Sequence, residues 1–251
     1  MAHTNSMRIR NIYLKESFYD LLSLWRTPSF FLPAILFPVV FYIFFGVVFN
    51  FSAAQSEYML VSYACFGMMG PAMFNFATAV ASDRAHGWLT LKRISPMPFS
   101  AYLVAKLFSS TVFAAIIALI LFVVAATLAD VELWEWQWLS LFAVLIVGSL
   151  PFALIGLILG LYLSDKAAPA IVNLIYLPMA FLSGLWVPIQ FLPELVGKFA
   201  YALPAFHYSQ LTHKVIGTDL QQPVWLHLAF LIGFTALFIA IARYRFHRLS
   251  K

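Results

Sequence analysis

Six apolar stretches dominate this sequence, and each is long enough to cross the hydrocarbon core of a bilayer as an α-helix. Such a helix needs about 20 mostly apolar residues. The predicted spans run from about Phe30 to Phe51, Tyr58 to Ala81, Ala101 to Ala129, Leu139 to Leu163, Ala168 to Val187 and Val224 to Ala242. Long apolar runs, rather than short alternating segments, argue against a membrane β-barrel. The sequence therefore predicts an all-α integral membrane protein with six transmembrane helices.

Composition supports a membrane protein. Hydrophobic residues make up 63% of the chain and charged residues 10%, and the mean hydropathy is +0.90. A soluble domain is about half apolar and a quarter charged, so one of this size would lack polar cover for its surface. No linker-like segment divides residues 1–251, which predicts a single transmembrane domain. The one cysteine, Cys65, lies in an apolar run and is interpreted as a small buried hydrophobe rather than a reactive thiol.

The positions of Lys and Arg predict the orientation, because these residues concentrate in cytoplasmic loops. With the N-terminus in the cytoplasm, 13 of the 15 basic residues fall on the cytoplasmic side, and only Lys198 and Lys214 fall outside. The inverse orientation would export nearly all of the positive charge. We therefore expect both termini in the cytoplasm.

Residues 1–27 precede the first span and contain an amphipathic helix. At 3.6 residues per turn one face is apolar, and it is formed by Leu14, Phe18, Leu21, Leu22 and Trp25. Such a helix is expected to lie along the inner membrane surface as an elbow helix; packing on a soluble partner is the alternative. A cleaved signal peptide ending near Ser52 is disfavoured, because the apolar run is too long and starts too late.

The inner loop of residues 82–98 is expected to contain a short helix that Ser82 or Asp83 caps and that Pro96 and Pro98 stop. Its apolar residues Trp88, Leu91 and Ile94 recur at i, i+3 and i+6. A helix of this kind can dock into a groove of another protein. A basic loop that rests on anionic lipid is an equally weighted alternative.

The outer segment of residues 188–223 is apolar but too short and too interrupted to cross the bilayer. Pro193, Gly197 and Pro204 divide it into short pieces, which predicts a re-entrant or interfacial helical hairpin between the fifth and sixth spans. Glu194 follows Pro193 and is expected to cap a helix, although contact with a substrate is the alternative. His207 and His213 are six residues apart, which is poor spacing for a shared metal, and both are interpreted as interfacial.

Inside the spans, Asn75 and Asn173 either line a pathway or form interhelical hydrogen bonds. The pair Gly156 and Gly160 permits close helix approach. No phosphate-binding G-x-x-x-x-G-K-[ST] motif occurs, and no catalytic motif or convincing pair of carboxylates was found. A pump built on this chain would therefore need a partner that supplies energy.

Two stretches carry a resemblance to a known family. They are residues 83–98 (DRAHGWLTLKRISPMP) and residues 182–204, which include LSGLWVPIQFLPEL and FAYALP. Together with the order of elbow helix, six spans and re-entrant segment, they make the chain similar to the permease subunits of type-2 ATP-binding-cassette exporters, which export drugs, polysaccharides or Nod factors. Where that family often has an acid two residues after Asp83, this chain has Ala85.

The resemblance implies that a coupling helix grips a separate ATPase through Asp83, Arg84, His86, Gly87, Trp88, Leu91, Lys92 and Arg93. It implies a transporter of two permeases and two ATPases, with this chain as a homodimer in the inner membrane of a bacterial cell. The implied candidates for the pathway and its outer gate are Asn75, Asn173, Ser183, Glu194, Phe199 and Tyr201. ATP and Mg²⁺ would bind the partner ATPase, and this chain would bind no cofactor and no metal.

The favoured function is thus the membrane subunit of an exporter for a hydrophobic or amphipathic substrate such as a drug, a lipid or a lipid-linked glycan. An ion-coupled secondary transporter or channel is the alternative and would work without an ATPase. A membrane enzyme is disfavoured, because the sequence shows no cluster of catalytic groups.

Overall fold

The computed structural model describes residues 2–49, 52–95 and 97–249, although the side chains of residues 2–8, 29–31, 93, 99 and 246–249 lie outside that description. Within this part of the chain the fold is entirely helical. The main helices are α1 (Ala2–Trp25), α2 (Pro28–Tyr42), α3 (Ala53–Ala85), α4 (Trp88–Ile94), α5 (Phe99–Leu128), α6 (Glu135–Tyr162), α7 (Ala168–Leu182), α8 (Glu194–Ala200), α9 (Pro204–Ile216) and α10 (Val224–Leu249). A π-helical segment, Ile43–Val48, extends α2, and a 3-10 turn, Ile189–Phe191, precedes α8.

Four helices are long and apolar enough to cross a membrane: Ala53–Ala85, Ser100–Leu128, Glu135–Tyr162 and Val224–Arg245. They coincide with four of the six predicted spans. Two shorter apolar helices, Leu32–Val48 and Ala168–Leu182, occupy the places of the predicted first and fifth spans. The predicted end of the first span at Phe51 lies outside the described residues, as does the predicted helix stop at Pro96.

The fifth apolar helix is shorter than predicted, because α7 ends at Leu182 instead of continuing to Val187. Gly184 adopts a left-handed conformation with φ of +81°. The backbone N–H of Leu185 donates to the carbonyl of Ala180 at 3.1 Å. This is the Schellman arrangement that closes a helix on a glycine.

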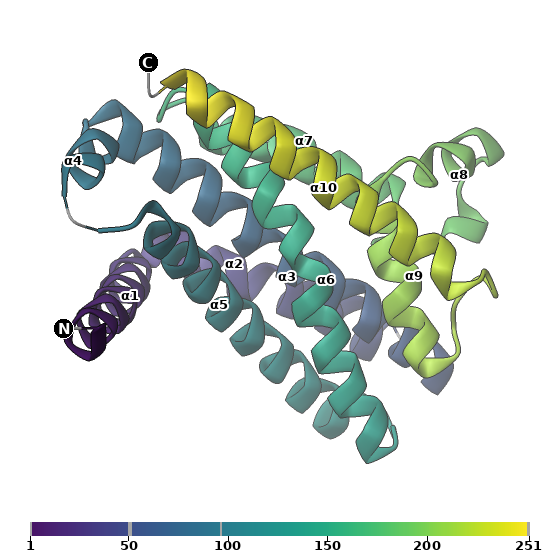
Figure 1. Ribbon diagram of the computed structural model, residues 1–251. Helices are drawn as coiled ribbons and strands as arrows, with labels where there is room; N and C mark the ends of the chain where they lie inside the picture. The colour runs from purple at the N-terminus through teal and green to yellow at the C-terminus, as the bar shows by residue number, and fades with distance from the viewer. Residues whose placement is uncertain (1, 50–51, 96, 250–251) are drawn as a thin grey trace.

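The centre of the protein is α3, which is buried along most of its length. Its residues from Met59 to Met73 are inaccessible or nearly so, Cys65 among them. Helices α2, α5, α6, α7 and α9 pack around it (Figure 1). The interpretation of Cys65 as a small buried hydrophobe agrees with this position.

Two glycines bring α6 into backbone contact with α3. A methyl group at Gly156 would lie 2.3 Å from the carbonyl oxygen of Met73, and one at Gly160 would lie 2.9 Å from that of Ala77. Both distances are far below a normal carbon–oxygen contact. Only glycine therefore allows the observed helix separation, as the small-residue spacing predicted.

The segment predicted to be re-entrant contains α8 and the longer α9. Most of α9 is buried between α3, α6 and α10. The interpretation of its histidines as interfacial is wrong, because His207 is 3% exposed and His213 is 0% exposed. Sequence spacing could not reveal this, since α9 alone is too polar and short to resemble a core helix.

Both termini and α4 lie at one end of the long helices, and α8, α9 and the α5–α6 loop lie toward the other (Figure 1). Helix α1, which contains the predicted elbow helix, packs against α5 at the α4 end. The segments predicted to be cytoplasmic are therefore grouped together in space.

Substitution of Gly156 by Ala is expected to destabilise the protein by about 1–3 kcal/mol, since the added methyl group would force α3 and α6 apart. Thermal unfolding of the purified chain in detergent measures this. Gly233→Ala in α10 is the matched control, because no atom lies within 4 Å of the added methyl group there. Equal midpoints for the two variants would contradict the packing role of Gly156.

Candidate functional site

The junction between α3 and α4 is a tight helix-to-helix turn. Gly87 has a φ of +75°, a left-handed conformation that favours glycine. His86, just before it, places its Nδ1 2.9 Å from the carbonyl oxygen of Ser82. A short helix is present in this loop as predicted, but the prediction that Ser82 or Asp83 caps it is wrong. Both residues lie in the last turns of α3, and α4 begins at Trp88 after Gly87.

Helix α4 presents three large apolar side chains to its surroundings. Trp88 is 54% exposed, Leu91 is 52% exposed and Ile94 is 79% exposed. Their i, i+3, i+6 spacing places them on one face, whereas Leu89 points into the core. We call this surface of Trp88, Leu91 and Ile94 the α4 apolar face.

Other predicted coupling residues are engaged within the chain. The Arg84 guanidinium donates to the carbonyl oxygens of Leu161 and Leu163, the latter at 2.6 Å. These carbonyls belong to the C-terminal end of α6, where a cation is favourable. Arg84 thus ties the end of α6 to the start of the α4 turn. The side chain of Arg93 lies outside the described residues.

Charged side chains join α1 to α4 and α5. Lys92 of α4 forms an ion pair with Glu16, and Lys106 of α5 forms one with Asp20. The Lys106–Asp20 pair is well buried, with side chains 10% and 9% exposed. Because both acids lie on α1, the elbow helix is fixed to the α4 end by its acidic side.

Tyr102 lies between these two ion pairs. The Lys92 ammonium is 4.7 Å from the centre of its ring and the Lys106 ammonium is 5.6 Å away. Its hydroxyl donates to Asp83 at 2.9 Å. Ammonium groups near an aromatic face are stabilised by the ring, so Tyr102 connects α3, α4 and α5. We call Glu16, Asp20, Asp83, Lys92, Tyr102 and Lys106 the charged cluster.

Sequence reasoning missed the charged cluster, although one signal was present. Lys106 is the eighth residue of the strongly apolar helix α5, and a lysine inside such a helix normally has a partner. Asp20 does not belong to the predicted apolar face of α1, yet its side chain is buried and pairs with Lys106. Of the residues predicted for the apolar face of the elbow helix, Leu14, Phe18 and Trp25 are exposed, and Leu21 and Leu22 are half-buried.

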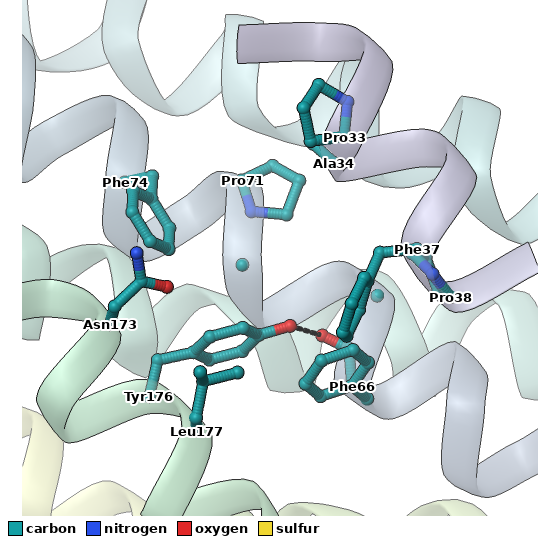
Figure 2. A pocket seen from close by; sticks show the side chains of 12 residues that line it. Pro33, Ala34, Phe37, Pro38, Phe66, Pro71, Phe74, Asn173, Tyr176 and Leu177 are labelled. Carbon is teal, nitrogen blue, oxygen red and sulfur yellow. Dashed lines mark hydrogen bonds between the residues drawn. The ribbon is translucent and has the colours of Figure 1, made fainter. Parts of the chain in front are cut away.

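A cavity lies where α2, α3 and α7 meet (Figure 2). Its volume is about 350 Å³, and it is open on one side. Its wall is formed by Pro33, Ala34, Phe37, Pro38, Phe66, Gly67, Gly70, Pro71, Phe74, Asn173, Tyr176 and Leu177. No charged side chain is among them, so the cavity suits an uncharged, apolar ligand.

Two polar groups of α7 reach this cavity. The Tyr176 hydroxyl donates to the backbone carbonyl of Phe66 at 2.8 Å, as Figure 2 shows, and is therefore already paired. The exposed amide of Asn173 lies at the rim. Asn173 was a sequence candidate. Tyr176 and the phenylalanines of the wall were not, because the sequence does not distinguish them from the other aromatic residues among the chain's 26 Phe and 11 Tyr.

The other pathway candidates do not line this cavity. Asn75 is buried and donates to the carbonyl of Lys106 at 3.3 Å and to the Ser110 hydroxyl at 3.0 Å, which is the interhelical bonding considered for it. Ser183 is buried just beyond α7, and its hydroxyl has no partner among the described residues.

The remaining gate candidates lie in and just after α8. Glu194 occupies the first turn and pairs with Lys198 at 2.7 Å, both highly exposed. Phe199 is 61% exposed. The Tyr201 hydroxyl accepts a hydrogen bond from the Gln222 amide at 2.7 Å. Glu194 thus lies at the helix start, where the helix dipole favours an acid, but it is not the cap, because the N-cap residue is Pro193.

Histidines of α9 form a buried polar network. His213 lies 3.1 Å from the Ser62 hydroxyl and 2.8 Å from the Thr218 hydroxyl, and its ring stacks on Tyr58. Burial lowers the pKa of His213 to about 3, and it also lowers the pKa of His207. No group of three metal-binding side chains occurs in the part of the chain that the structure describes.

Comparison with known proteins gives two matches. The model of a family described as "ABC-2 type transporter" matches residues 18–216, which are 199 of the 251 residues. The chain is also 25% identical over 238 residues to "Putative transport permease YvfS" of Bacillus subtilis (strain 168). That alignment covers 93% of this chain and 96% of the relative, so the two proteins correspond over nearly their whole lengths.

Substitution of Asp20 by Asn is expected to destabilise the protein by about 3–5 kcal/mol, because it leaves the Lys106 ammonium buried without its counter-charge. Thermal unfolding in detergent provides the measurement. Glu194→Gln is the matched control: its pair with Lys198 is exposed to solvent and contributes about 0–1 kcal/mol. Similar midpoints for the two variants would show that the buried pair is unimportant.

Acidification is expected to destabilise the protein through His213. The unfolded chain takes up a proton near pH 6.5, whereas the folded chain does so only near pH 3. The free energy of unfolding is not reduced by His213 above about pH 6.5. It falls as the pH drops from about 6.5 toward 3, because in this range the unfolded state binds a proton at His213 that the folded state does not. Unfolding midpoints measured from pH 7.5 to 4.5 should fall less steeply for His213→Gln than for the parent. An unchanged slope would exclude His213 as the cause.

Proposed function

Because the chain belongs to the ABC-2 type transporter family and is therefore a membrane-embedded transport permease subunit, we propose that it forms the membrane path of an ATP-driven exporter and is coupled to a separate ATPase. In this proposal residues 1–251 act as one permease domain. The sequence contains no phosphate loop, so ATP and Mg²⁺ would be bound and used by the partner.

The observation that carries this proposal is the α4 apolar face. An exposed cluster of Trp, Leu and Ile at the end of a membrane protein is costly to leave in water, and it fits a hydrophobic groove on a partner. The face is attached to the membrane helices through Gly87 and Arg84 and to the elbow helix through Lys92. Force applied to α4 would therefore reach α1, α3, α5 and α6.

The orientation proposed for the chain places the α4 end in the cytoplasm. Thirteen of the 15 basic residues belong to segments assigned to that side. The grouping of both termini with α4 in Figure 1 supports an even number of crossings. Six crossings result if Leu32–Val48 and Ala168–Leu182 also span, and the segment with α8 and α9 would then lie on the outer side.

The pathway proposed for the substrate runs along the cavity between α2, α3 and α7. Asn173 exposes its amide on this otherwise apolar surface. In a bilayer such a group normally faces protein or water rather than lipid. Two copies that meet across this surface would enclose the cavity, and its uncharged aromatic wall favours a hydrophobic or amphipathic substrate.

Charged substitutions in the α4 apolar face are expected to abolish binding of the ATPase. The test co-expresses the chain with a candidate phosphate-loop ATPase partner from the same organism and measures how much ATPase co-purifies. Trp88→Glu combined with Leu91→Glu should reduce recovery at least tenfold, because carboxylates would have to be buried in an apolar groove.

The matched control is Trp225→Glu combined with Leu195→Glu. These residues are each 68% exposed and belong to α10 and α8, at the opposite end of the protein. Recovery of the ATPase should be unchanged in this control. If the α4 variant retained the ATPase as well as the control does, the proposed coupling surface would be wrong.

A further inference from the structure

Three exposed basic residues remain on the elbow helix α1 and at the position directly after its last residue, Trp25, once the acids of the helix are paired. Glu16 and Asp20 are its two acidic residues, and both are paired with lysines of other helices. Arg10, Lys15 and Arg26 are exposed. Among the side chains that the structure describes, no carboxylate lies within ion-pair distance of these three. The outer surface of α1 is therefore strongly positive.

The three basic residues flank the apolar strip of the helix on both sides. At about 100° per residue, Arg10 lies about 80° to one side of Phe18, and Lys15 and Arg26 lie about 60–80° to the other. Leu14, Phe18 and Trp25 along the strip are exposed. An apolar strip bordered by cations is the arrangement of a helix that sits at the boundary between headgroups and acyl chains.

A groove continues this strip between α1 and α5. Its volume is about 260 Å³, and its wall is formed by Phe18, Leu21, Leu22, Trp25 and Val112. All five side chains are apolar, so a hydrocarbon chain fits the groove. The ring of Trp25 also packs on Phe113 of α5, with ring centres 5.9 Å apart, which holds the groove wall in place.

From this juxtaposition we propose that α1 and α5 form a binding site for an anionic phospholipid. One acyl chain occupies the groove of Phe18, Leu22 and Val112. The acidic headgroup is bound at the membrane surface by Arg10, Lys15 or Arg26, which the internal ion pairs of Glu16 and Asp20 leave available. Zwitterionic lipid can fill the same groove but gains no net attraction from the cations.

This site is independent of the proposed ATPase. It uses only residues of this chain, and it can be measured on the permease alone. Failure of the ATPase to bind the α4 apolar face would leave the lipid site untouched. Conversely, loss of lipid selectivity would say nothing against the coupling proposal.

The first experiment measures lipid selectivity by native mass spectrometry. The full-length chain in detergent is incubated with equal amounts of phosphatidylglycerol and phosphatidylcholine that carry identical palmitoyl and oleoyl chains. Phosphatidylglycerol should be retained in excess, and Arg10→Gln, Lys15→Gln and Arg26→Gln should each lower the ratio by up to about fivefold at low ionic strength. The preference should weaken as salt is added.

A charge-matched control removes three other exposed basic residues, by Lys166→Gln, Lys198→Gln and Arg243→Gln. The α1 variant combines Arg10→Gln, Lys15→Gln and Arg26→Gln. The control triple variant has the same net charge as the α1 variant and should keep the parental lipid ratio. Thermal midpoints of both triple variants identify any loss of fold. Equal retention of the two lipids by the parent, or an unchanged ratio in the α1 variant, would overturn the proposal.

The second experiment tests the acyl-chain position through the fluorescence of Trp25. Phosphatidylglycerol with brominated chains, present as a minor component of phosphatidylcholine vesicles, should quench the parent more than the same fraction of brominated phosphatidylcholine does. Trp25→Phe should remove this excess quenching. Equal quenching by both lipids would show that Trp25 contacts only bulk lipid, and it would contradict a selective site. A change of oligomeric state in the α1 variant without a change in lipid ratio would make the surface a protein interface instead.

Discussion

Close contact between the backbones of α3 and α6 at Gly156 and Gly160 is the constraint on which the rest of the structure depends. Helices in a bilayer gain little from the hydrophobic effect, so van der Waals contact at short separation must hold them together. Gly156 allows α6 to approach the Met73 carbonyl of α3 without a side chain between them. With α6 fixed on one side of α3, the remaining helices pack around this buried helix.

At the α4 end, the helices are held together by the ion pairs and hydrogen bond of the charged cluster as well as by van der Waals contact. Ion pairs from α1 reach Lys92 and Lys106, and Tyr102 connects both lysines to Asp83. Partly buried pairs of this kind contribute little net stability compared with apolar packing, but they fix which groups meet. In the proposed exporter this specificity would make α1, α4 and α5 respond together when an ATPase moves α4.

Hydropathy alone identified the membrane class, because burial in lipid needs only long apolar segments. The i, i+3, i+6 spacing of Trp88, Leu91 and Ile94 predicted the exposed face of α4, and Gly156 with Gly160 predicted close packing. The sequence could not place His207 and His213, since their burial depends on α3, α6 and α10, which are distant in the chain. The Asp20–Lys106 pair and the Tyr176 wall of the cavity likewise arise only when α1, α2, α3, α5 and α7 are assembled.

We propose that this chain is a transport path that depends on ATP hydrolysis by a partner. Transport of an uncharged fluorescent hydrophobic compound across proteoliposomes tests this proposal most directly, with the chain alone and with the ATPase that co-purifies with it. Movement is expected only when both proteins and hydrolysable ATP are present. Movement by the chain alone, driven by an ion gradient and indifferent to ATP, would contradict it.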